Sequence, residues 1–213
     1  MSVIWEYLPS FLAALLSTLE IALISGLIAL AIGVLAALLS RLQSRAVHGI
    51  IEFYTSVFRA TPLLVQLYFT YYGLPVLGLS ISPFASALIA FSLNTGAYVT
   101  EIIRGGEKSI DPGQYMAAYA MGMSMPMCMR FIILPQVIRR VLSPLITQFS
   151  YLIKDTSLAA VLVIAELTYA YRNAASVTYR PFESLAVPMV FYFLLYLLFK
   201  LASNLVRERG RAR

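Results

Sequence analysis

The stretch TPLLVQLYFTYYGLPVLGLSISPFASALIAFSLNTGAYVT, residues 61–100, contains no Asp, Glu, Lys, Arg or His. An α-helix rises about 1.5 Å per residue, so about 20 apolar residues cross the roughly 30 Å hydrocarbon core of a bilayer. The stretch is therefore long enough for two membrane spans. Its middle holds Gly73-Leu74-Pro75, Gly78 and Ser82-Pro83, and Gly and Pro are typical of a chain reversal. We predict one span over residues 52–74 and the next over residues 83–103.

The composition of the whole chain also indicates a membrane protein. Of its 213 residues, 60% are hydrophobic and only 12% are charged, and the mean hydropathy is +0.80. A soluble domain carries about 25% charged residues, whereas charge inside a bilayer is costly. The net charge is +6, but the Lys and Arg residues lie between apolar runs. This pattern is typical of cytoplasmic loops, and we predict no nucleic-acid partner.

Three further apolar runs complete the prediction of an all-α integral membrane protein with five transmembrane helices in one domain, residues 1–213. The first run covers residues 10–40, where Glu20 is the one ionisable side chain. The others cover residues 131–153 and 185–206, and we predict a polar loop over residues 171–183 between them. The more polar residues 105–130 predict a cytoplasmic loop that contains a short helix.

Basic residues set the predicted orientation. They gather after the first, third and fifth spans, at Arg41, Arg45, Arg104, Lys108, Arg130, Arg139, Arg140, Arg207, Arg209, Arg211 and Arg213. By the positive-inside rule these ends are cytoplasmic. The other ends hold Arg172 and Arg180, balanced by Glu166 and Glu183. We therefore predict an external N-terminus and a cytoplasmic C-terminus, as an odd number of spans requires.

Four motifs occur along almost the whole chain: FRATPLLVQ (58–66), EIIRGG (101–106), GQYMAAYAMG (113–122) followed by IILPQ (132–136), and KDTSL (154–158). The third resembles the EAA loop of ABC importer permeases. The other three resemble the polar amino-acid branch of that family, in the same order and with fitting spacing. The chain is thus identified as similar to type I ABC importer permeases.

This resemblance implies the membrane-spanning subunit of an ATP-driven importer for polar or charged amino acids, in the bacterial plasma (inner) membrane. The implied partners are a second permease copy or a homologue, ABC ATPase subunits and an extracytoplasmic amino-acid-binding protein. The sequence contains no G-x-x-x-x-G-K-[ST] motif, the phosphate-binding loop of many ATPases. We therefore expect ATP on the partner subunit, no cofactor on this chain and no enzymatic activity of its own.

The EAA-like loop predicts where the ATPase docks. In the family, a cytoplasmic helix of this loop enters a groove on the ATPase. Pro112 and Gly122 bracket such a helix here, and small side chains permit close approach. The glutamate that names the loop is Met116 in this chain, so its acidic contact is absent. A short interfacial helix without a partner is the alternative. The predicted coupling residues are Gln114, Met116, Ala117, Ala118 and Gly122.

Methionines are concentrated in the same loop. Six of the eight lie between Met116 and Met129. Methionine side chains repack easily, which suits both a docking surface and internal packing. Together with Cys128 they are also soft ligands for Cu(I), but alternate positions on a helix point to different sides. We predict no metal site.

A second set of polar residues predicts the substrate pathway. Asn94, Tyr98 and Glu101 are spaced i, i+4 and i+7, which places them on one helix face, and polar groups in a span face a pore or a partner helix. Glu101 either meets a substrate cation or pairs with Arg104. Lys154 and Asp155 form either an internal ion pair or a cation and an anion for a zwitterion. Thr156 and Ser157 satisfy backbone groups at a helix break. The predicted pathway residues are Asn94, Tyr98, Glu101, Lys154, Asp155, Thr156 and Ser157.

A self-sufficient secondary transporter or channel is the alternative function. It uses Glu20, Glu101, Lys154 and Asp155 as ion or proton sites. The small size of the chain, the absence of an internal repeat and the EAA-like loop favour the importer subunit.

Overall fold

The computed structural model describes the backbone of residues 2–42 and 44–211 and the side chains of residues 5–42 and 44–206. Within these ranges all regular secondary structure is helical, which confirms the all-α prediction. Arg207, Arg209, Arg211 and Arg213, used above to predict orientation, have side chains outside the described residues. The α-helices are α1 (Ser2–Leu39), α2 (Arg45–Ala60), α3 (Leu63–Tyr68), α4 (Leu74–Val76), α5 (Pro83–Lys108), α6 (Pro112–Ala120), α7 (Met125–Cys128), α8 (Leu134–Asp155), α9 (Leu167–Thr178) and α10 (Pro181–Arg211).

Within the described residues, three helical stretches are long and apolar enough to cross a membrane, namely Trp5–Leu39, Pro83–Lys108 and Pro181–Val206. They correspond to the first, third and fifth predicted spans. The fourth predicted span lies in α8, which has sufficient length but a more polar sequence that includes Arg139 and Arg140. The count of five spans stays a prediction.

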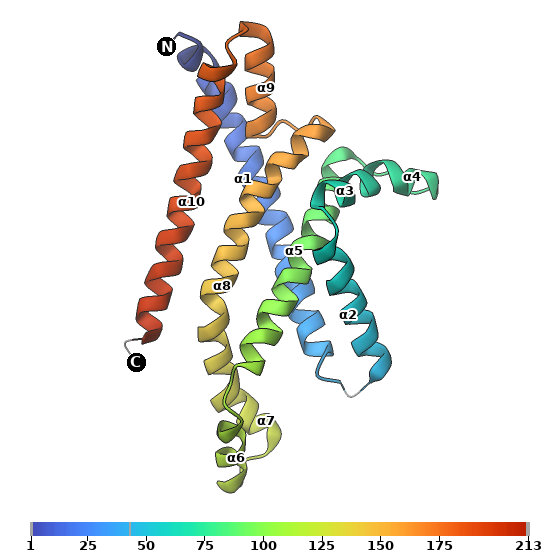
Figure 1. The fold of residues 1–213 in the computed structure, drawn as a ribbon, viewed down its shortest axis with the longest axis vertical. Helices are drawn as coiled ribbons and strands as arrows, with labels where there is room; N and C mark the ends of the chain where they lie inside the picture. The colour runs from blue at the N-terminus through green and yellow to red at the C-terminus, as the bar shows by residue number, and fades with distance from the viewer. Residues whose placement is uncertain (1, 43, 212–213) are drawn as a thin grey trace.

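The second predicted span, residues 52–74, is not one helix. α2 ends at Ala60, and the chain becomes extended at Thr61, with φ −97° and ψ 142°. Pro62 is the cause, because proline disfavours helical geometry in the residue before it. α3 starts after the break, passes through a π-helical turn at Phe69–Gly73 and ends in α4. In Figure 1 this arm projects sideways from the bundle.

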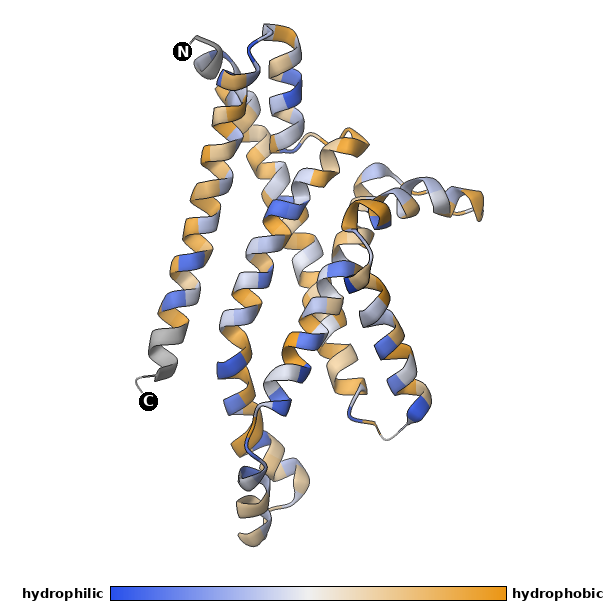
Figure 2. Ribbon diagram, viewed as in Figure 1, coloured by the Kyte–Doolittle hydropathy of each residue, from blue (hydrophilic) through white to orange (hydrophobic). Residues whose placement is uncertain are grey.

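α1 and α5 form the centre of the bundle, and α8 packs beside them (Figure 1). Gly33 of α1 allows the close approach, because a Cβ atom there would lie 2.6 Å from the Cβ of Val99. The buried cluster that joins these helices contains Ile21, Leu67, Phe91 and Leu152. Figure 2 shows apolar residues along α1 and α10 and more polar colouring along α8 and the lower half of α5.

Two predicted loops contain helices. The predicted polar loop 171–183 is wrong over most of its length, because α9 occupies Leu167–Thr178. The buried carboxylate of Glu166 caps this helix, accepting from the amides of Thr168 at 2.9 Å and Tyr169 at 2.7 Å. The predicted loop 105–130 contains α6 and α7 after the last turn of α5, and α6 matches the short helix that was predicted within it.

The two ends of the chain lie at opposite ends of the bundle (Figure 1). α6 and α7 project beyond the same end as the C-terminus. An odd number of membrane crossings places the two termini at opposite ends in this way. Which end is cytoplasmic stays a prediction from the charge bias.

Candidate functional site

A cavity of about 600 Å³ lies where the end of α2 meets α5 and α8. We call it the central cavity. It contains one cationic and one anionic side chain, Arg59 from α2 and Asp155 from the end of α8. Its lining consists of Arg59, Ala60, Thr61, Pro62, Leu63, Asn94, Tyr98, Gln148, Tyr151 and Asp155.

The helix break at Thr61–Pro62 builds one wall of the central cavity. A break leaves carbonyl groups without helical partners, and two buried amides supply donors. Gln66 donates from Nε2 to the carbonyls of Phe58 at 2.9 Å and Thr61 at 3.0 Å. Asn94 donates from Nδ2 to the Phe58 carbonyl at 2.7 Å and to Oε1 of Gln66 at 3.2 Å. Asn94 therefore fixes the broken backbone to α5 as well as lining the cavity.

Arg59 is held in place by α5. Its guanidinium carbon lies 5.4 Å from the centre of the Tyr98 ring, a distance at which a cation is attracted to the ring face. Its Nη1 lies 3.9 Å from Oε2 of Glu101. Tyr98 and Glu101 therefore both contact the guanidinium group of Arg59.

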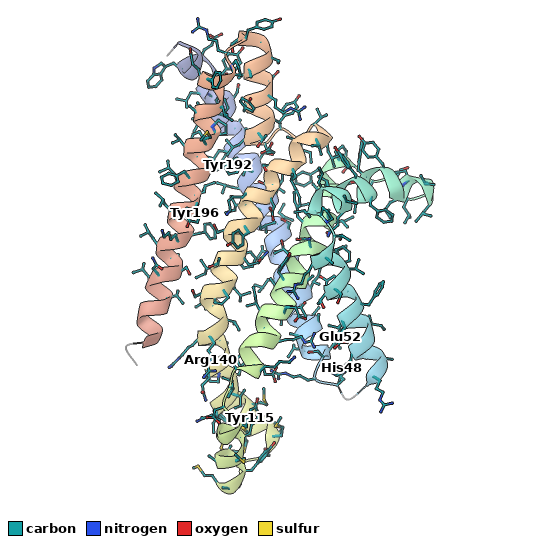
Figure 3. The ribbon with its side chains drawn as sticks, in the orientation of Figure 1. His48, Glu52, Tyr115, Arg140, Tyr192 and Tyr196 are labelled. Atoms are coloured by element: carbon teal, nitrogen blue, oxygen red, sulfur yellow. The ribbon has the colours of Figure 1, made fainter. Side chains whose placement is uncertain are left out.

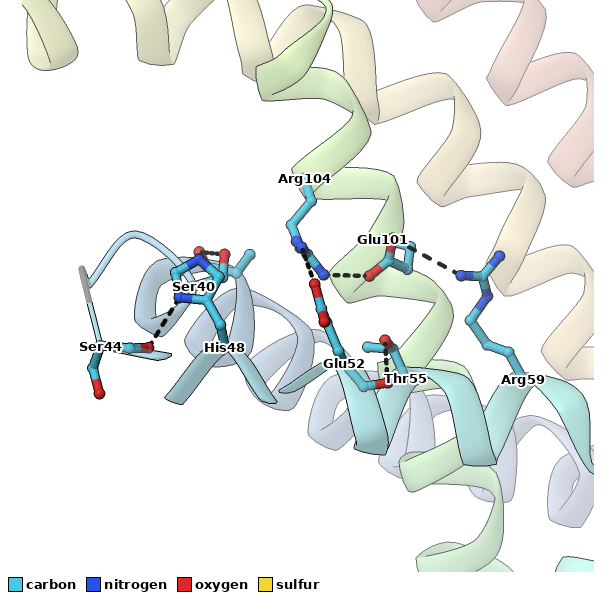
Figure 4. Close-up of polar contacts among 9 residues, drawn as sticks. Ser40, Ser44, His48, Glu52, Thr55, Arg59, Glu101 and Arg104 are labelled. Atoms are coloured by element: carbon cyan, nitrogen blue, oxygen red, sulfur yellow. Dashed lines mark hydrogen bonds and ion pairs between the residues drawn. The ribbon is translucent and has the colours of Figure 1, made fainter. Parts of the chain in front are cut away.

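Glu101 contacts more than one cation, as Figure 4 shows. Its Oε1 accepts a hydrogen bond from Nη1 of Arg104 at 2.8 Å, one turn along α5. Arg104 also lies 4.0 Å from Oε1 of Glu52 on α2. The pairing of Glu101 with Arg104, one of the two alternatives considered from sequence, is present, and the contact with Arg59 adds to it.

Lys154 and Asp155 point in different directions. The Lys154 ammonium lies 4.3 Å from the centre of the Tyr151 ring and 5.6 Å from that of Tyr196 on α10. Asp155 instead lines the central cavity. Consecutive helical residues are turned by about 100°, and of the two only Asp155 lines the central cavity. That the two charges act as a pair stays a prediction. Figure 3 labels Tyr196 on the far side of α8 from α2.

Thr156 and Ser157 lie in the 3-10 helix that continues from α8, Thr156–Leu162. Thr156 is fully buried, and its hydroxyl donates to the carbonyl of Ile153 at 2.7 Å. This contact fits the predicted role at a helix end. Neither residue lines the central cavity.

We call residues 109–133, which include α6 and α7, the coupling segment. As predicted from Pro112 and Gly122, α6 covers Pro112–Ala120, and Gly122 follows it with φ +74°. Glycine adopts this left-handed geometry without strain. Asp111 caps the start of α6 by accepting from the amide of Gly113 at 2.7 Å.

Polar contacts fix the coupling segment to the bundle. Arg140 of α8 donates to the hydroxyl of Ser109 at 2.8 Å and also to the Ser109 carbonyl. Gln136 donates to Oε1 of Gln114 at 3.1 Å. Figure 3 shows Arg140 and Tyr115 where α8 meets α6. These contacts join α6 and the end of α5 to α8.

The predicted coupling residues divide into two groups. Ala118 is fully buried, in a cluster with Cys128 and Ile133. Its small side chain packs inside the segment, and its role in coupling stays a prediction. By contrast, Met116 is 67% exposed and Met121 is 79% exposed. Gln114, Ala117 and Gly122 are also exposed.

A second cavity of about 800 Å³ lies between the coupling segment and the ends of α1, α2 and α5. We call it the coupling-end cavity. Arg104 and Lys108 line it, as does Arg41, whose Nη2 lies 3.1 Å from Oε2 of Glu107. Tyr115 of α6 completes this side of the wall. No cluster of three or more His, Cys, Asp or Glu suited to a metal ion occurs among the described side chains.

Sequence reasoning missed Arg59, Gln148 and Tyr151 of the central cavity. The available signal for Arg59 was its position two residues before Thr61-Pro62, because side chains next to a helix break in a span can face a cavity. Gln148 and Tyr151 lie one turn apart on α8, at i and i+3. Their spacing to Asp155, i+7 from Gln148, would have placed all three on one face.

The chain matches the family described as "Binding-protein-dependent transport system inner membrane component" over residues 29–209, and it belongs to that family. It is 34% identical to the arginine transport system permease protein ArtQ of Bacillus subtilis, covering 95% of this chain and 93% of ArtQ. It is 38% identical to the nopaline transport system permease protein NocM of Agrobacterium fabrum, covering 88% and 82%.

Solved structures agree with this assignment. A chain of an amino acid ABC transporter crystallised with histidines superposes with a TM-score of 0.92 at 35% identity, over 97% of this chain and 96% of that one. A chain of the methionine transporter MetNI superposes with a TM-score of 0.74 at 16% identity, over 94% and 96%, which shows a shared fold. The family therefore favours an importer subunit over a self-sufficient channel.

Proposed function

We propose that this chain is the membrane subunit of an ATP-driven importer for polar or charged amino acids, with its substrate passing through the central cavity. The observation that carries the proposal is the presence of Arg59 and Asp155 in the same cavity. A free amino acid has a carboxylate and an ammonium group, and a cavity with one guanidinium and one carboxylate complements both. The arginine, nopaline and L-cystine permeases to which the chain is similar are named for substrates of this chemistry.

Six of the lining residues have a role in this proposal. Arg59 binds the substrate carboxylate, because a guanidinium offers paired donors that match two carboxylate oxygens. Asp155 accepts from the ammonium group. Tyr98 orients Arg59, and Gln148 and Tyr151 supply hydrogen-bonding groups for a polar substrate side chain. Asn94 holds the α2 break in place.

The coupling segment is the proposed contact with the ATPase. Its exposed side chains include Met116, Tyr119 and Met121. Methionine and aromatic residues are enriched in protein interfaces, and flexible methionines adapt to a partner surface. The contacts from Arg140 and Gln136 connect this surface to the spans. A second permease copy, the ATPase that holds ATP and an external binding protein complete the importer.

The test is uptake by the complete importer reconstituted in vesicles. Radiolabelled L-arginine, L-glutamine and L-cystine serve as probes. Arg59→Gln is expected to reduce uptake at least about tenfold, since a hydrogen bond to a charged group is worth about 1.5–3 kcal/mol. Arg139→Gln is the matched control, because Arg139 is exposed on α8 and lies outside the central cavity. ATP-independent uptake, or equal uptake by the two variants, would contradict the proposal.

A further inference from the structure

Glu101 connects the two cavities. Its Oε2 lies 3.9 Å from Arg59, which lines the central cavity, and its Oε1 accepts from Arg104 at 2.8 Å. Arg104 lines the coupling-end cavity. Figure 4 shows the carboxylate of Glu101 between the two guanidinium groups. One anion is therefore shared by two cations, and each cation faces a different cavity.

The two contacts are unequal. The contact with Arg104 is a short hydrogen bond within α5, whereas the contact with Arg59 is longer and joins α5 to α2. The Glu101 side chain is 31% exposed and the Arg59 side chain is 43% exposed. Ion pairs with this much access to water are weak, about 0.2–1 kcal/mol. A competing carboxylate can therefore replace Glu101 on Arg59.

We propose that Glu101 is a positioning residue that relays occupation of the central cavity to the coupling segment. The relay rests on the proposed function, because it needs a substrate carboxylate on Arg59. That carboxylate displaces Glu101 from Arg59, and the charge of Glu101 then acts on Arg104 alone. The Arg59–Glu101 contact between α2 and α5 is lost at the moment when the substrate binds.

The structure provides a direct route from this change to α6. α5 continues from Arg104 to Glu107, which pairs with Arg41 at the end of α1, and then to Ser109, which Arg140 holds. Ser109 begins the coupling segment. A small rotation of the end of α5 against α2 therefore displaces α6 without an intervening flexible linker. A coupling claim of this kind requires an element that both sites influence, and here that element is the end of α5.

The relay predicts opposite effects of one substitution on binding and on coupling. In Glu101→Gln, no carboxylate competes for Arg59, so the substrate is expected to bind about fivefold more tightly, the equivalent of one exposed ion pair. The signal to Arg104 is lost at the same time. Substrate-stimulated ATP hydrolysis is therefore expected to fall at least about fivefold. Simple structural damage would weaken both.

The experiment uses the permease–ATPase complex and measures two quantities. Binding of the transported probe, L-arginine or L-glutamine, is measured by scintillation proximity without the binding protein, and ATP hydrolysis is measured in vesicles with it. Glu52→Gln is the matched control, because Glu52 also lies near Arg104 but is not paired with Arg59. In this variant, substrate binding and ATP hydrolysis are expected to stay within about twofold of the unmodified protein, as for the loss of an exposed ion pair.

The outcomes separate the relay from the site. Unchanged binding and stimulation in Glu101→Gln, or a parallel loss of both, would overturn the relay. If that variant does not accumulate, Glu101→Asp provides the test: it keeps the charge but shortens the reach toward Arg59, and it should bind more tightly with weaker stimulation. Unchanged binding in Arg59→Gln would instead reject the central cavity as the substrate site, whatever Glu101→Gln shows.

Discussion

α5 and α10 are both long enough and apolar enough to cross a membrane, yet they differ in how far they are buried inside the protein. Of the most apolar window of α5, 61% is buried inside the protein, compared with 11% for α10. α5 is the less apolar of the two. The helix that hydropathy identifies less strongly is therefore the one that the other helices surround.

The difference follows from what each helix contacts. α5 buries polar side chains that make hydrogen bonds inside the bundle, among them Ser92, Asn94 and Thr100. α10 exposes large apolar side chains, including Phe193 and Leu198. Lipid satisfies apolar groups but not polar ones, so polar groups collect where protein or a pathway meets them. High hydropathy thus identifies helices that cross the membrane, whereas polar residues within such a helix indicate where the candidate site lies.

The largest expected effect tests burial with one residue type on both helices. Phe91 of α5 is fully buried and Phe193 of α10 is 58% exposed. Phe91→Ala is expected to cost about 3–5 kcal/mol of stability because it leaves a cavity. Phe193→Ala should cost less than about 1 kcal/mol, because lipid or detergent replaces the lost contact. Thermal unfolding in detergent measures both, and equal losses would show that a partner covers α10 in the assembled importer.

A smaller effect is expected where α1 meets α5. Gly33→Ala would place a Cβ atom 2.6 Å from the Cβ of Val99 and 3.1 Å from the amide nitrogen of Thr100. Neither atom can move without its helix, so we expect a loss of about 1–3 kcal/mol. Gly49→Ala on α2 is the control, because no atom lies within 4 Å of a Cβ there. Comparable melting temperatures for the two variants would contradict the close α1–α5 packing.

The smallest effect concerns adjacent residues at the end of α8, one facing the central cavity beside α5 and the other facing α10. Asp155→Asn is expected to reduce uptake about tenfold, because it removes the only acidic group that lines the central cavity in the described structure. Lys154→Gln should change uptake by less than about threefold. It removes cation–π contacts with the Tyr151 and Tyr196 rings, but Lys154 does not line the central cavity. Initial uptake rates in vesicles measure both variants. A larger loss in Lys154→Gln than in Asp155→Asn would place the site closer to α10.

Much of the candidate site could be predicted from sequence. Asn94 and Tyr98 share a helix face and do line one cavity with Asp155. The short helix of the coupling segment begins at Pro112 as its turn residues indicate. The roles of these residues in transport and coupling stay predictions. Of the adjacent Lys154 and Asp155, only Asp155 lines the cavity, because helical geometry turns neighbouring side chains apart.

The sequence by itself determined the class of this protein: an all-helical membrane subunit with a helix bracketed by Pro112 and Gly122. Those features depend on local chemistry, namely apolar length, charge bias and turn residues. The tertiary structure alone decided that Arg59 joins Asp155 in a cavity, that Ala118 is buried and that Glu101 lies between two arginines. Each depends on how α2, α5, α8 and α6 are oriented against one another, and packing between distant segments sets that orientation.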